Sequence, residues 1–284
     1  MVLQAEEGLI TTSARILVAT AVPAERDAVA RAFPDQGDEV RLPGAVLCRT
    51  APGAGPGRTT TTADDVPGRT TAGAGASRAA AGAARAAVVI DLLAAGVGPA
   101  RAAASTAAAL TAAALAGAPY DLVVSAGIGG GFTPGAPLGS LVVADAITAA
   151  DLGAETADGF LPVTDLGFGT VTHRPPESLV RGVAEATGAR TGTVLTVSTV
   201  TGTAARAAAL RARHPRALAE GMEGFGVAEA ADAQGVPVLE IRAISNPVGP
   251  RDRAAWRIGD ALAALTAAFG KLAPALESWE PYDQ

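Results

Sequence analysis

Residues 220–246 read EGMEGFGVAEAADAQGVPVLEIRAISN, and this stretch decides the fold because it holds one complete helix-to-strand unit. Small, helix-favouring residues dominate from 227 to 234, and Gly235 and Pro237 end the helix. Residues 236–244 are mostly apolar over a length that is typical of a buried strand. The stretch therefore predicts a helix that leads directly into the interior of a sheet.

Polar residues stand at both ends of this unit. Ser245 and Asn246 come at the carboxyl end of the strand, and in open α/β sheets that end faces the ligand crevice. Met222 and Glu223 precede the helix, and they join the same crevice only if the fold brings the helix start there. The stretch outlines a ligand site.

The rest of the chain repeats the alternation of strand and helix. Strands are expected at residues 15–20, 88–95, 120–126, 141–147 and 195–200. Helices are expected from Pro23 onward and at about 100–116, 179–186, 204–213 and 255–272. This alternation predicts an α/β fold, a three-layer sandwich whose mostly parallel, mixed central sheet is flanked by helices.

Length and composition favour a single domain. The chain has 284 residues, of which 49% are hydrophobic, so it can bury a full core as one domain over residues 1–284. Residues 51–86 are a low-complexity tract of Gly, Thr, Ala, Arg and Pro with few large apolar side chains. We predict that this tract is a mobile surface insertion, which the core tolerates because loop closure costs little.

Charge and cysteine content exclude several classes of protein. A net charge of -6 argues against a nucleic-acid partner, and no apolar run approaches the roughly 20 residues that span a membrane. Cys48 is the only cysteine, so no internal disulfide can form, and the amino terminus lacks the pattern of a secretory signal. We expect a cytoplasmic protein that binds a small molecule.

The glycine-rich segment 127–131 (GIGGG) follows an expected strand and is predicted to be a loop, where missing side chains let the backbone approach a ligand. It does not fit the dinucleotide-binding pattern GxGxxG, because Phe132 occupies the third glycine position and Pro134 and Pro137 interrupt any following helix. Asp145, at the distance of a ribose-binding acid, is weak support on its own. No Gly-Lys-Ser or Gly-Lys-Thr is present, so a P-loop is excluded.

Motifs in a fixed order identify a family resemblance over residues 15–269, apart from the 51–86 tract. They are RILVATAVPAE, GVGPARAA, VVSAGIGGGF, GSLVVADAI and GMEGFGVA with RAISN. Through them the chain resembles the purine nucleosidase and nucleoside phosphorylase superfamily, and within it the enzymes that release hypoxanthine from futalosine in menaquinone biosynthesis. The resemblance implies an N-glycosyl hydrolase that uses no metal or organic cofactor and assembles as a homo-oligomer.

The resemblance also implies roles for two glutamates. Glu25 matches the residue that activates the attacking water, and Glu223 matches the one that holds the ribose hydroxyls, with Met222 packing against the sugar. Carboxylate oxygens suit the second task because they accept bonds from two neighbouring hydroxyls. Both residues also have a structural interpretation: Glu25 as an acid that complements a helix dipole, and Glu223 as a helix-capping acid.

Asn246 departs from the adenine-releasing members of the superfamily, which carry an Asp here that assists protonation of N7. An amide can donate to the O6 of hypoxanthine while it accepts from a protonated N7. A carboxylate would leave polar groups unpaired, at about 1–3 kcal/mol. We therefore expect a 6-oxopurine substrate, in whose reaction Asn246 stabilises the departing base. The alternative is an Asn that only forms a turn before Pro247.

Backbone and loop residues complete the expected site. Ile128 and Gly129 would line the cleft through their backbone, and Thr203, in the loop 199–203, would flank the purine. Glu240 and Arg242 share one strand face, so we expect an internal ion pair between them. His173 and His214 lack metal-ligand spacing and receive no chemical role.

Two alternatives to this hydrolase remain open. A phosphorylase of the same fold, or an enzyme acting on another purine nucleoside, would need different pocket chemistry; Arg26 and Arg101 are candidate phosphate ligands. A catalytically silent nucleoside-binding module would keep Glu223 and Asn246 but could dispense with Glu25. The presence of Glu25 favours an enzyme.

Overall fold

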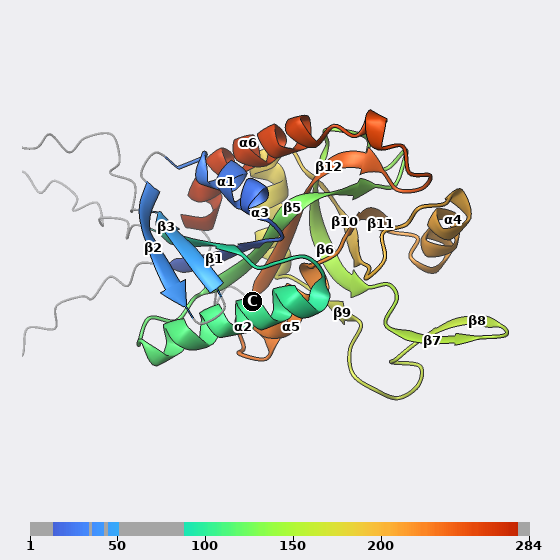
Figure 1. Cartoon of the computed structure of the whole chain (residues 1–284), viewed down its shortest axis with the longest axis horizontal. Helices are drawn as coiled ribbons and strands as arrows, with labels where there is room; N and C mark the ends of the chain where they lie inside the picture. Colours follow the sequence, from blue (N-terminus) through green and yellow to red (C-terminus); the bar gives the residue numbers. More distant parts are fainter. Residues whose placement is uncertain (1–13, 34–35, 43–44, 51–87, 278–284) are drawn as a thin grey trace, which may run out of the picture.

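One mixed sheet forms the centre of the molecule, as seen in a computed structural model that describes residues 14–33, 36–42, 45–50 and 88–277 (Figure 1). Its strands, with the separate β7-β8 hairpin, are β1 (Arg15–Thr20), β2 (Gln36–Leu42), β3 (Ala45–Thr50), β4 (Val89–Ala94), β5 (Leu122–Gly131), β6 (Leu141–Ala149), β7 (Gly153–Thr156), β8 (Gly159–Pro162), β9 (Thr172–His173), β10 (Arg190–Thr196), β11 (Ala217–Gly221) and β12 (Val238–Pro247). The helices are α1 (Pro23–Ala30), α2 (Pro99–Leu115), α3 (Glu177–Thr187), α4 (Ala204–Arg213), α5 (Gly224–Asp232), α6 (Ile258–Glu277) and a 3-10 turn, η1 (Arg253–Ala255).

The strand order is β11-β10-β6-β12-β5-β1-β4-β3-β2, and β9 pairs with β6. The central pairings β4-β1, β1-β5, β5-β12, β6-β10 and β10-β11 are parallel, whereas β12-β6 and the edge strands β2 and β3 pair antiparallel. An additional antiparallel pairing of β11 with β5 closes β5, β12, β6, β10 and β11 into a ring. The same strand β5 thus belongs to the open sheet at its start and to the ring at its end.

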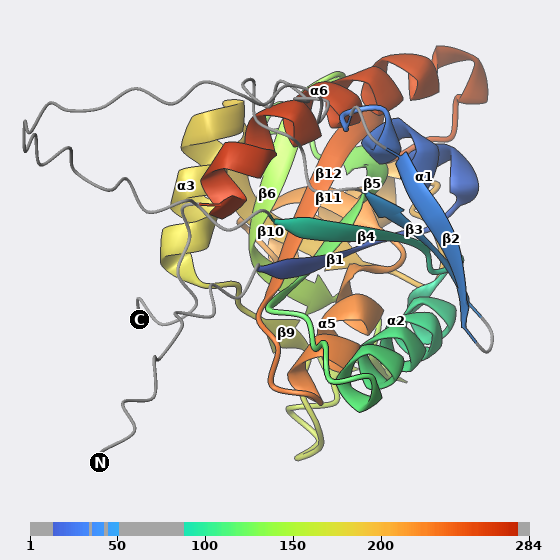
Figure 2. The ribbon, with the colours of Figure 1, turned by 90° about the vertical axis from the view of Figure 1, so that its left-hand side faces the viewer.

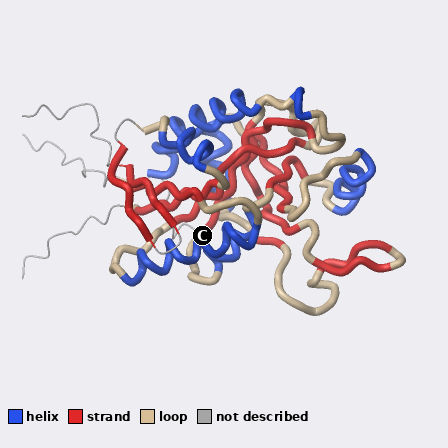
Figure 3. Tube along the Cα trace, viewed as in Figure 1, coloured by secondary structure: helices blue, strands red, loops and turns tan. Residues whose placement is uncertain are grey.

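Helices cover both faces of the sheet, which confirms the predicted three-layer α/β arrangement (Figures 2 and 3). On one face α1, α3 and α6 pack on the strands through a buried cluster that includes Val29, Leu179 and Phe269. On the other face α2 and α5 lie side by side, and Gly226 of α5 is so close to the carbonyl of Pro99 that a side chain there would overlap it. Burial of these apolar faces supplies the main drive for folding.

The glycine-rich segment is a strand and not a turn, which corrects the expectation of a loop after residue 126. β5 runs on to Gly131 and pairs antiparallel with the ring-closing strand β11, with Gly130 opposite Glu220 and Gly131 opposite Ala219. A Cβ at Gly129 would lie 2.8 Å from the carbonyl oxygen of Glu220, so glycine is needed here for close approach between strands. The β11-β5 closure depends on these missing side chains.

The strand expected at residues 195–200 is also corrected. β10 covers Arg190–Thr196, and the chain then leaves the sheet. The reason is that side chains take the backbone donors that a strand would use: Asp151 accepts from the Ser198 N–H at 2.8 Å, and Glu220 accepts from the Thr201 N–H at 2.9 Å. Residues 197–203 are therefore a loop fixed by two carboxylates.

Other expected elements agree with the structure to within a few residues, and several short strands, β2, β3, β7, β8, β9 and β11, have no counterpart in the sequence prediction. The predicted insertion at 51–86 lies outside the described residues. The β7-β8 hairpin projects from the body of the molecule (Figure 1). No helix within the described ranges is long and apolar enough to cross a membrane.

Candidate active site

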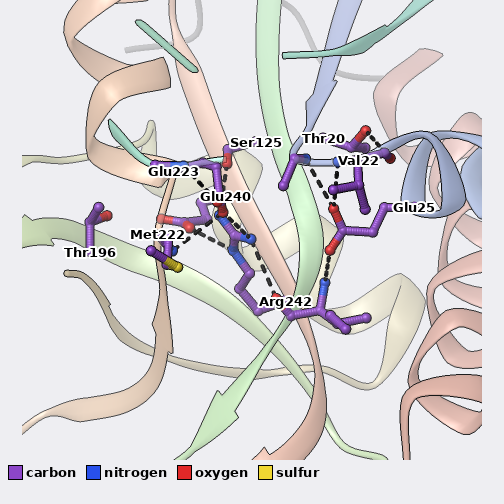
Figure 4. A network of polar contacts seen from close by, with 12 residues as sticks. Thr20, Val22, Glu25, Ser125, Thr196, Met222, Glu223, Glu240 and Arg242 are labelled. Carbon is purple, nitrogen blue, oxygen red and sulfur yellow. Dashed lines mark hydrogen bonds and ion pairs between the residues drawn. The ribbon is translucent and has the colours of Figure 1, made fainter. Parts of the chain in front are cut away.

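A gap in the hydrogen-bond ladder of β5 marks the candidate active site. β1 pairs with β5 from Leu122 to Ser125, and β11 pairs with it at Gly130 and Gly131, so residues 126–129 have no partner on that edge among the described strands. The gap lies at the carboxyl ends of β1, β5 and β12, where α/β sheets place their ligands. Side chains fill it (Figure 4).

Glu25 reaches this gap from the first turn of α1, and it is buried with 4% of its surface exposed. Its Oε1 accepts from the N–H of Ile128 at 2.8 Å. Its Oε2 accepts from the N–H groups of Ala21 and Val22 at 3.0 and 3.3 Å. The carboxylate therefore satisfies the start of α1 and also contacts β5, so the structural and the functional interpretations of this residue are compatible.

Glu223 stands where β11 passes into α5, and the fold does bring this helix start to the crevice. Its Oε1 accepts from the N–H of Gly98, in the GVGPA turn, at 3.2 Å. Its Oε2 accepts from the N–H of Met222 at 3.3 Å and pairs with Nη1 of Arg242 at 3.2 Å. Met222 is half-buried beside it.

Arg242 joins these groups into one network. Its Nη1 donates to the carbonyl of Ile128 at 3.4 Å as well as to Glu223, and its Nη2 donates to Oγ of Ser125 at 3.2 Å. Its Nε donates to Oε1 of Glu240 at 2.8 Å, which confirms the predicted ion pair. The backbone N–H of Ile128 thus contacts Glu25 and its carbonyl contacts Arg242, so this one residue links the two glutamates of the site.

Two glycines leave the space that this network occupies. A Cβ at Gly127 would lie 2.7 Å from Oε1 of Glu25 and 2.9 Å from Nη1 of Arg242. A Cβ at Gly221 would lie 3.0 Å from Cζ of Arg242. These separations are at or below the closest that carbon atoms normally approach such groups, so the glycines are required by the site and not by backbone conformation.

The charges around Glu25 tune its acidity. Burial raises the pKa of Glu25 above its ordinary value, the Ile128 N–H and Arg242 oppose this, and the neighbouring Glu223 carboxylate adds to it. Burial disfavours the charged form of Arg242, yet Glu240, Glu223 and Glu25 together hold its pKa above the ordinary value. Glu25 therefore binds a proton more tightly than an exposed glutamate, which is the direction of shift that suits a general base.

Asn246 lies at the end of β12 against the ring-closing end of β5. Its Oδ1 accepts from Oγ of Ser245 at 2.9 Å, and its Nδ2 donates to the carbonyl of Pro247 at 3.1 Å. A Cβ on Gly130 would lie 3.3 Å from Nδ2. The half-buried amide still has one N–H and one lone pair beyond these bonds, enough to donate to and accept from one ligand.

Of the remaining expected site residues, two lie in the gap of β5 and one is exposed. Ile128 and Gly129 lie in the gap of β5, with the Ile128 peptide in direct contact with the network. Thr203 is exposed, and its Oγ1 accepts from the N–H of Arg206, so its hydroxyl caps α4. The buried member of that loop is Thr201, whose Oγ1 donates to Glu220.

Sequence reasoning missed several residues of the network. The period-two pattern predicts the Glu240-Arg242 pair, but it contains no signal for the contacts of Arg242 with Glu223 and Ser125, because these arise between strands. Glu220 gave no signal at all, although it is buried.

Polar groups outside the network form separate contacts. Asp145 pairs with Arg216, and His173 contacts Glu229 at 2.8 Å. In the part of the chain that the structure describes, no group of three or more His, Cys, Asp or Glu side chains is arranged to hold a metal ion.

Comparison with known proteins places this geometry in a family. The sequence profile of the phosphorylase superfamily matches residues 45–276. The chain is 71% identical to a futalosine hydrolase of Streptomyces coelicolor over 269 residues, which covers 95% of this chain and 99% of that protein. The chain belongs to the futalosine hydrolase family of the phosphorylase superfamily.

Solved structures show the same fold at low sequence identity. The S-adenosylhomocysteine nucleosidase of Streptococcus pyogenes, in complex with 5-methylthiotubericidin, superposes with a TM-score of 0.70 at 16% identity, over 95% of this chain and 99% of that one. The native futalosine hydrolase of Helicobacter pylori gives 0.66 at 16% identity, over 94% and 98%. The superfamily resemblance inferred from the ordered motifs is confirmed by the profile match and by the 71% identity.

Proposed function

We propose that the protein hydrolyses the N-glycosidic bond of futalosine and releases hypoxanthine and dehypoxanthine futalosine, a reaction of menaquinone biosynthesis. The observation that carries the proposal is the pair of buried carboxylates, Glu25 and Glu223, that Arg242 and the Ile128 peptide hold at the gap in β5. The 71% identity to a futalosine hydrolase supports the choice of substrate.

Glu25 is the proposed general base. It accepts a proton from a water molecule as the water oxygen forms a bond to C1′ of the ribose, while the C1′–N9 bond breaks and its electron pair passes to the purine. The transition state has oxocarbenium character, as in other glycoside hydrolysis. The water leaves its hydroxyl on C1′ and its proton on Glu25, which returns that proton to solvent, while solvent supplies the proton that the purine gains at N7. The reaction therefore consumes one water and no other reactant.

Glu223 and Met222 are proposed to hold the ribose. The Glu223 oxygens accept from the 2′- and 3′-hydroxyls, and Met222 packs against the sugar ring, so that C1′ faces the water next to Glu25. Arg242 fixes the Glu223 carboxylate for this task. Ile128 and Gly129 line the cleft through their backbone.

Asn246 is proposed to recognise and stabilise the base. Its amide donates to O6 of hypoxanthine and accepts from the protonated N7, while negative charge develops on the departing purine. Thr203 and its loop are proposed to flank the purine from the other side. A 6-oxopurine fits this amide better than adenine, whose 6-amino group donates.

Hydrolysis is favoured over phosphorolysis by the contacts of a candidate phosphate ligand. Arg26 donates from both Nε and Nη2 to Oδ1 of Asp27, at 2.9 and 2.8 Å. This pairing leaves fewer guanidinium N–H groups to bind a phosphate beside the sugar. The site around Glu25, by contrast, supplies a base for water.

Incubation of the purified protein with futalosine, in the presence and in the absence of phosphate, tests the proposal. We expect hypoxanthine and a free sugar product at the same rate in both, measured by chromatography. A sugar phosphate would identify a phosphorylase, and binding of futalosine without any product would identify a silent nucleoside-binding module. Either result would contradict the proposal.

Three further features stay predictions from the sequence. We propose a homo-oligomer, a cytoplasmic location, and a single domain over residues 1–284 with the 51–86 tract as an insertion. Sedimentation of the purified protein would test the first of these.

A further inference from the structure

Glu240 is a buried carboxylate that the proposed mechanism does not use. It lies on β12, two residues before Arg242, and is fully buried. Its Oε1 accepts from Nε of Arg242 at 2.8 Å, whereas its Oε2 has no hydrogen-bond partner among the described residues. A buried, half-satisfied carboxylate is unfavourable for stability, so it calls for a functional explanation.

The surrounding backbone is built to admit this carboxylate. A Cβ at Gly224, the first residue of α5, would overlap both carboxylate oxygens of Glu240. Gly221 in turn leaves room for the guanidinium of Arg242. The two glycines that enclose Met222 and Glu223 in the GMEG motif therefore make the space for the ion pair directly beneath the proposed sugar-binding residues.

Three carboxylates from three different elements face one arginine here. Arg242 on β12 faces Glu240 on the same strand, Glu223 at the start of α5 and Glu25 on α1. Glu25 faces Arg242 and Glu223, and its neighbour Arg26 is engaged with Asp27 on the outside of α1. Glu240 faces Arg242 and Glu223. Arg242 thus interacts with three carboxylates. A stronger interaction with one of them weakens its interaction with the other two.

We propose that Glu240 is a positioning residue that tunes the general base: it holds Arg242 through Nε and neutralises part of its charge, so that Glu25 keeps its proton affinity and Glu223 stays free to bind ribose. This inference rests on the proposed function of Glu25 and Glu223. Without the Glu240 charge, the full charge of Arg242 acts on Glu25 and draws Glu223 toward itself. The base then becomes weaker and ionises at lower pH.

The variant Glu240→Gln tests the proposal with little change of shape. The amide oxygen of Gln can still accept from Nε of Arg242, so the geometry is kept while the charge is removed. We expect the acid limb of the kcat/KM profile for futalosine hydrolysis to move to lower pH. We also expect KM to rise, because Glu223 is held more tightly by Arg242. The ratio of variant to wild-type rate should increase as the pH falls.

A merely structural role would give a different result. Loss of packing would lower the rate by a similar factor at every pH and leave the acid limb in place, and loss of fold stability at low pH would move that limb to higher pH, opposite to the expected shift. Thermal unfolding of both proteins across the same pH range separates loss of fold from loss of activity. An unmoved acid limb in a folded Glu240→Gln protein overturns the proposal.

A matched control is available on α5. Glu229→Gln makes the same chemical change at an exposed residue that contacts His173. Its acid limb should coincide with that of the wild type, and a shift equal to that of Glu240→Gln would show a general effect of net charge and contradict the proposal. Wild-type protein that fails to hydrolyse futalosine contradicts the proposed function itself, which keeps the two failures apart.

Discussion

Two buried ion clusters of this molecule have opposite compositions. At the amino-terminal half of β4, one carboxylate, that of Asp91, accepts from Arg15 at 2.9 Å, from Arg49 at 2.8 and 3.0 Å, and from the Tyr120 hydroxyl at 2.7 Å. At the carboxyl ends of β1, β5 and β12, one arginine is shared by three carboxylates. The first cluster has a surplus of donors and the second a surplus of acids.

The difference appears in the acidity of the carboxyl groups. Burial raises the pKa of Asp91, but hydrogen bonds from Arg49 and Tyr120 and the charges of both arginines more than offset this, so its pKa is lower than usual. Burial and Glu223 leave the pKa of Glu25 higher than usual despite Arg242. A carboxylate paired with two arginines stabilises the fold, whereas a buried carboxylate that shares one arginine with other acids keeps its affinity for a proton, as a base needs.

Removal of the proposed base should have the largest effect. Glu25→Gln keeps the size of the side chain but cannot accept a proton from water, so we expect kcat to fall by about 10²- to 10⁴-fold. The measurement is the rate of hypoxanthine release from futalosine, with thermal unfolding as a check on the fold. Turnover equal to that of the wild type would exclude Glu25 as the base. It would also contradict the view that one cluster serves catalysis and the other serves stability.

Removal of the other central carboxylate should affect stability instead. Asp91→Ala leaves Arg15 and Tyr120 without their buried acceptor, and we expect a loss of about 3 kcal/mol in the free energy of unfolding, at the low end for a buried pair because Arg49 is 44% exposed. Urea unfolding measures this loss. The protein that remains folded should turn over futalosine at the wild-type kcat, and a large fall in kcat would show that the two clusters are coupled.

Addition of an acid to the carboxylate-rich end sharpens the comparison. Asn246→Asp replaces the proposed donor to O6 with an acceptor, so transition-state stabilisation for futalosine should fall by about 1–3 kcal/mol. The relative rate on the 6-amino analogue should rise. The kcat/KM values for the two substrates provide the measurement, and an unchanged ratio would exclude Asn246 as the residue that reads position 6.

A fall in pH should distinguish the roles of the two clusters, and it is the smallest of these perturbations. Glu25 must be ionised to act, so kcat/KM falls as the pH drops through its raised pKa. The same raised pKa stabilises the folded state as the pH falls, because the folded state binds this proton more tightly than the unfolded state does. Asp91 contributes stability that is fully present above its unfolded pKa of about 3.9 and is lost as the pH falls through its lower folded value. Activity should therefore disappear before tryptophan fluorescence reports unfolding. Coincident curves would contradict this order.

The sequence was sufficient for the helices and the longer strands, and insufficient for the short strands and for the junctions between elements. Periodicity and Gly or Pro signals locate β1, α1, α2 and β12 because those patterns are local. The course of the GIGGG segment depends on the Glu220 carbonyl, and the end of β10 depends on Asp151 and Glu220. Those partners are remote in the sequence, so local propensity favoured a turn in one place and a longer strand in the other.

The candidate site divides in the same way. Glu25, Glu223 and Asn246 were found through family motifs, and the fold brings their elements together at one end of the sheet. The shared arginine was predicted with only one of its partners, since a strand pattern shows which residues share a face but not what the next strand places opposite them. Thr203 was selected by its place in a loop, and the structure assigns its hydroxyl to the start of α4.

The gap in the β5 ladder makes one amide of the backbone a built-in probe. In a continuous sheet the N–H of Ile128 would be bonded to a neutral carbonyl, but here its acceptor is the carboxylate of Glu25. The ¹⁵N and ¹H resonances of that single amide therefore follow the ionisation of the proposed base directly. The protein thus contains its own spectroscopic reporter of the catalytic proton, with no label beyond the isotope.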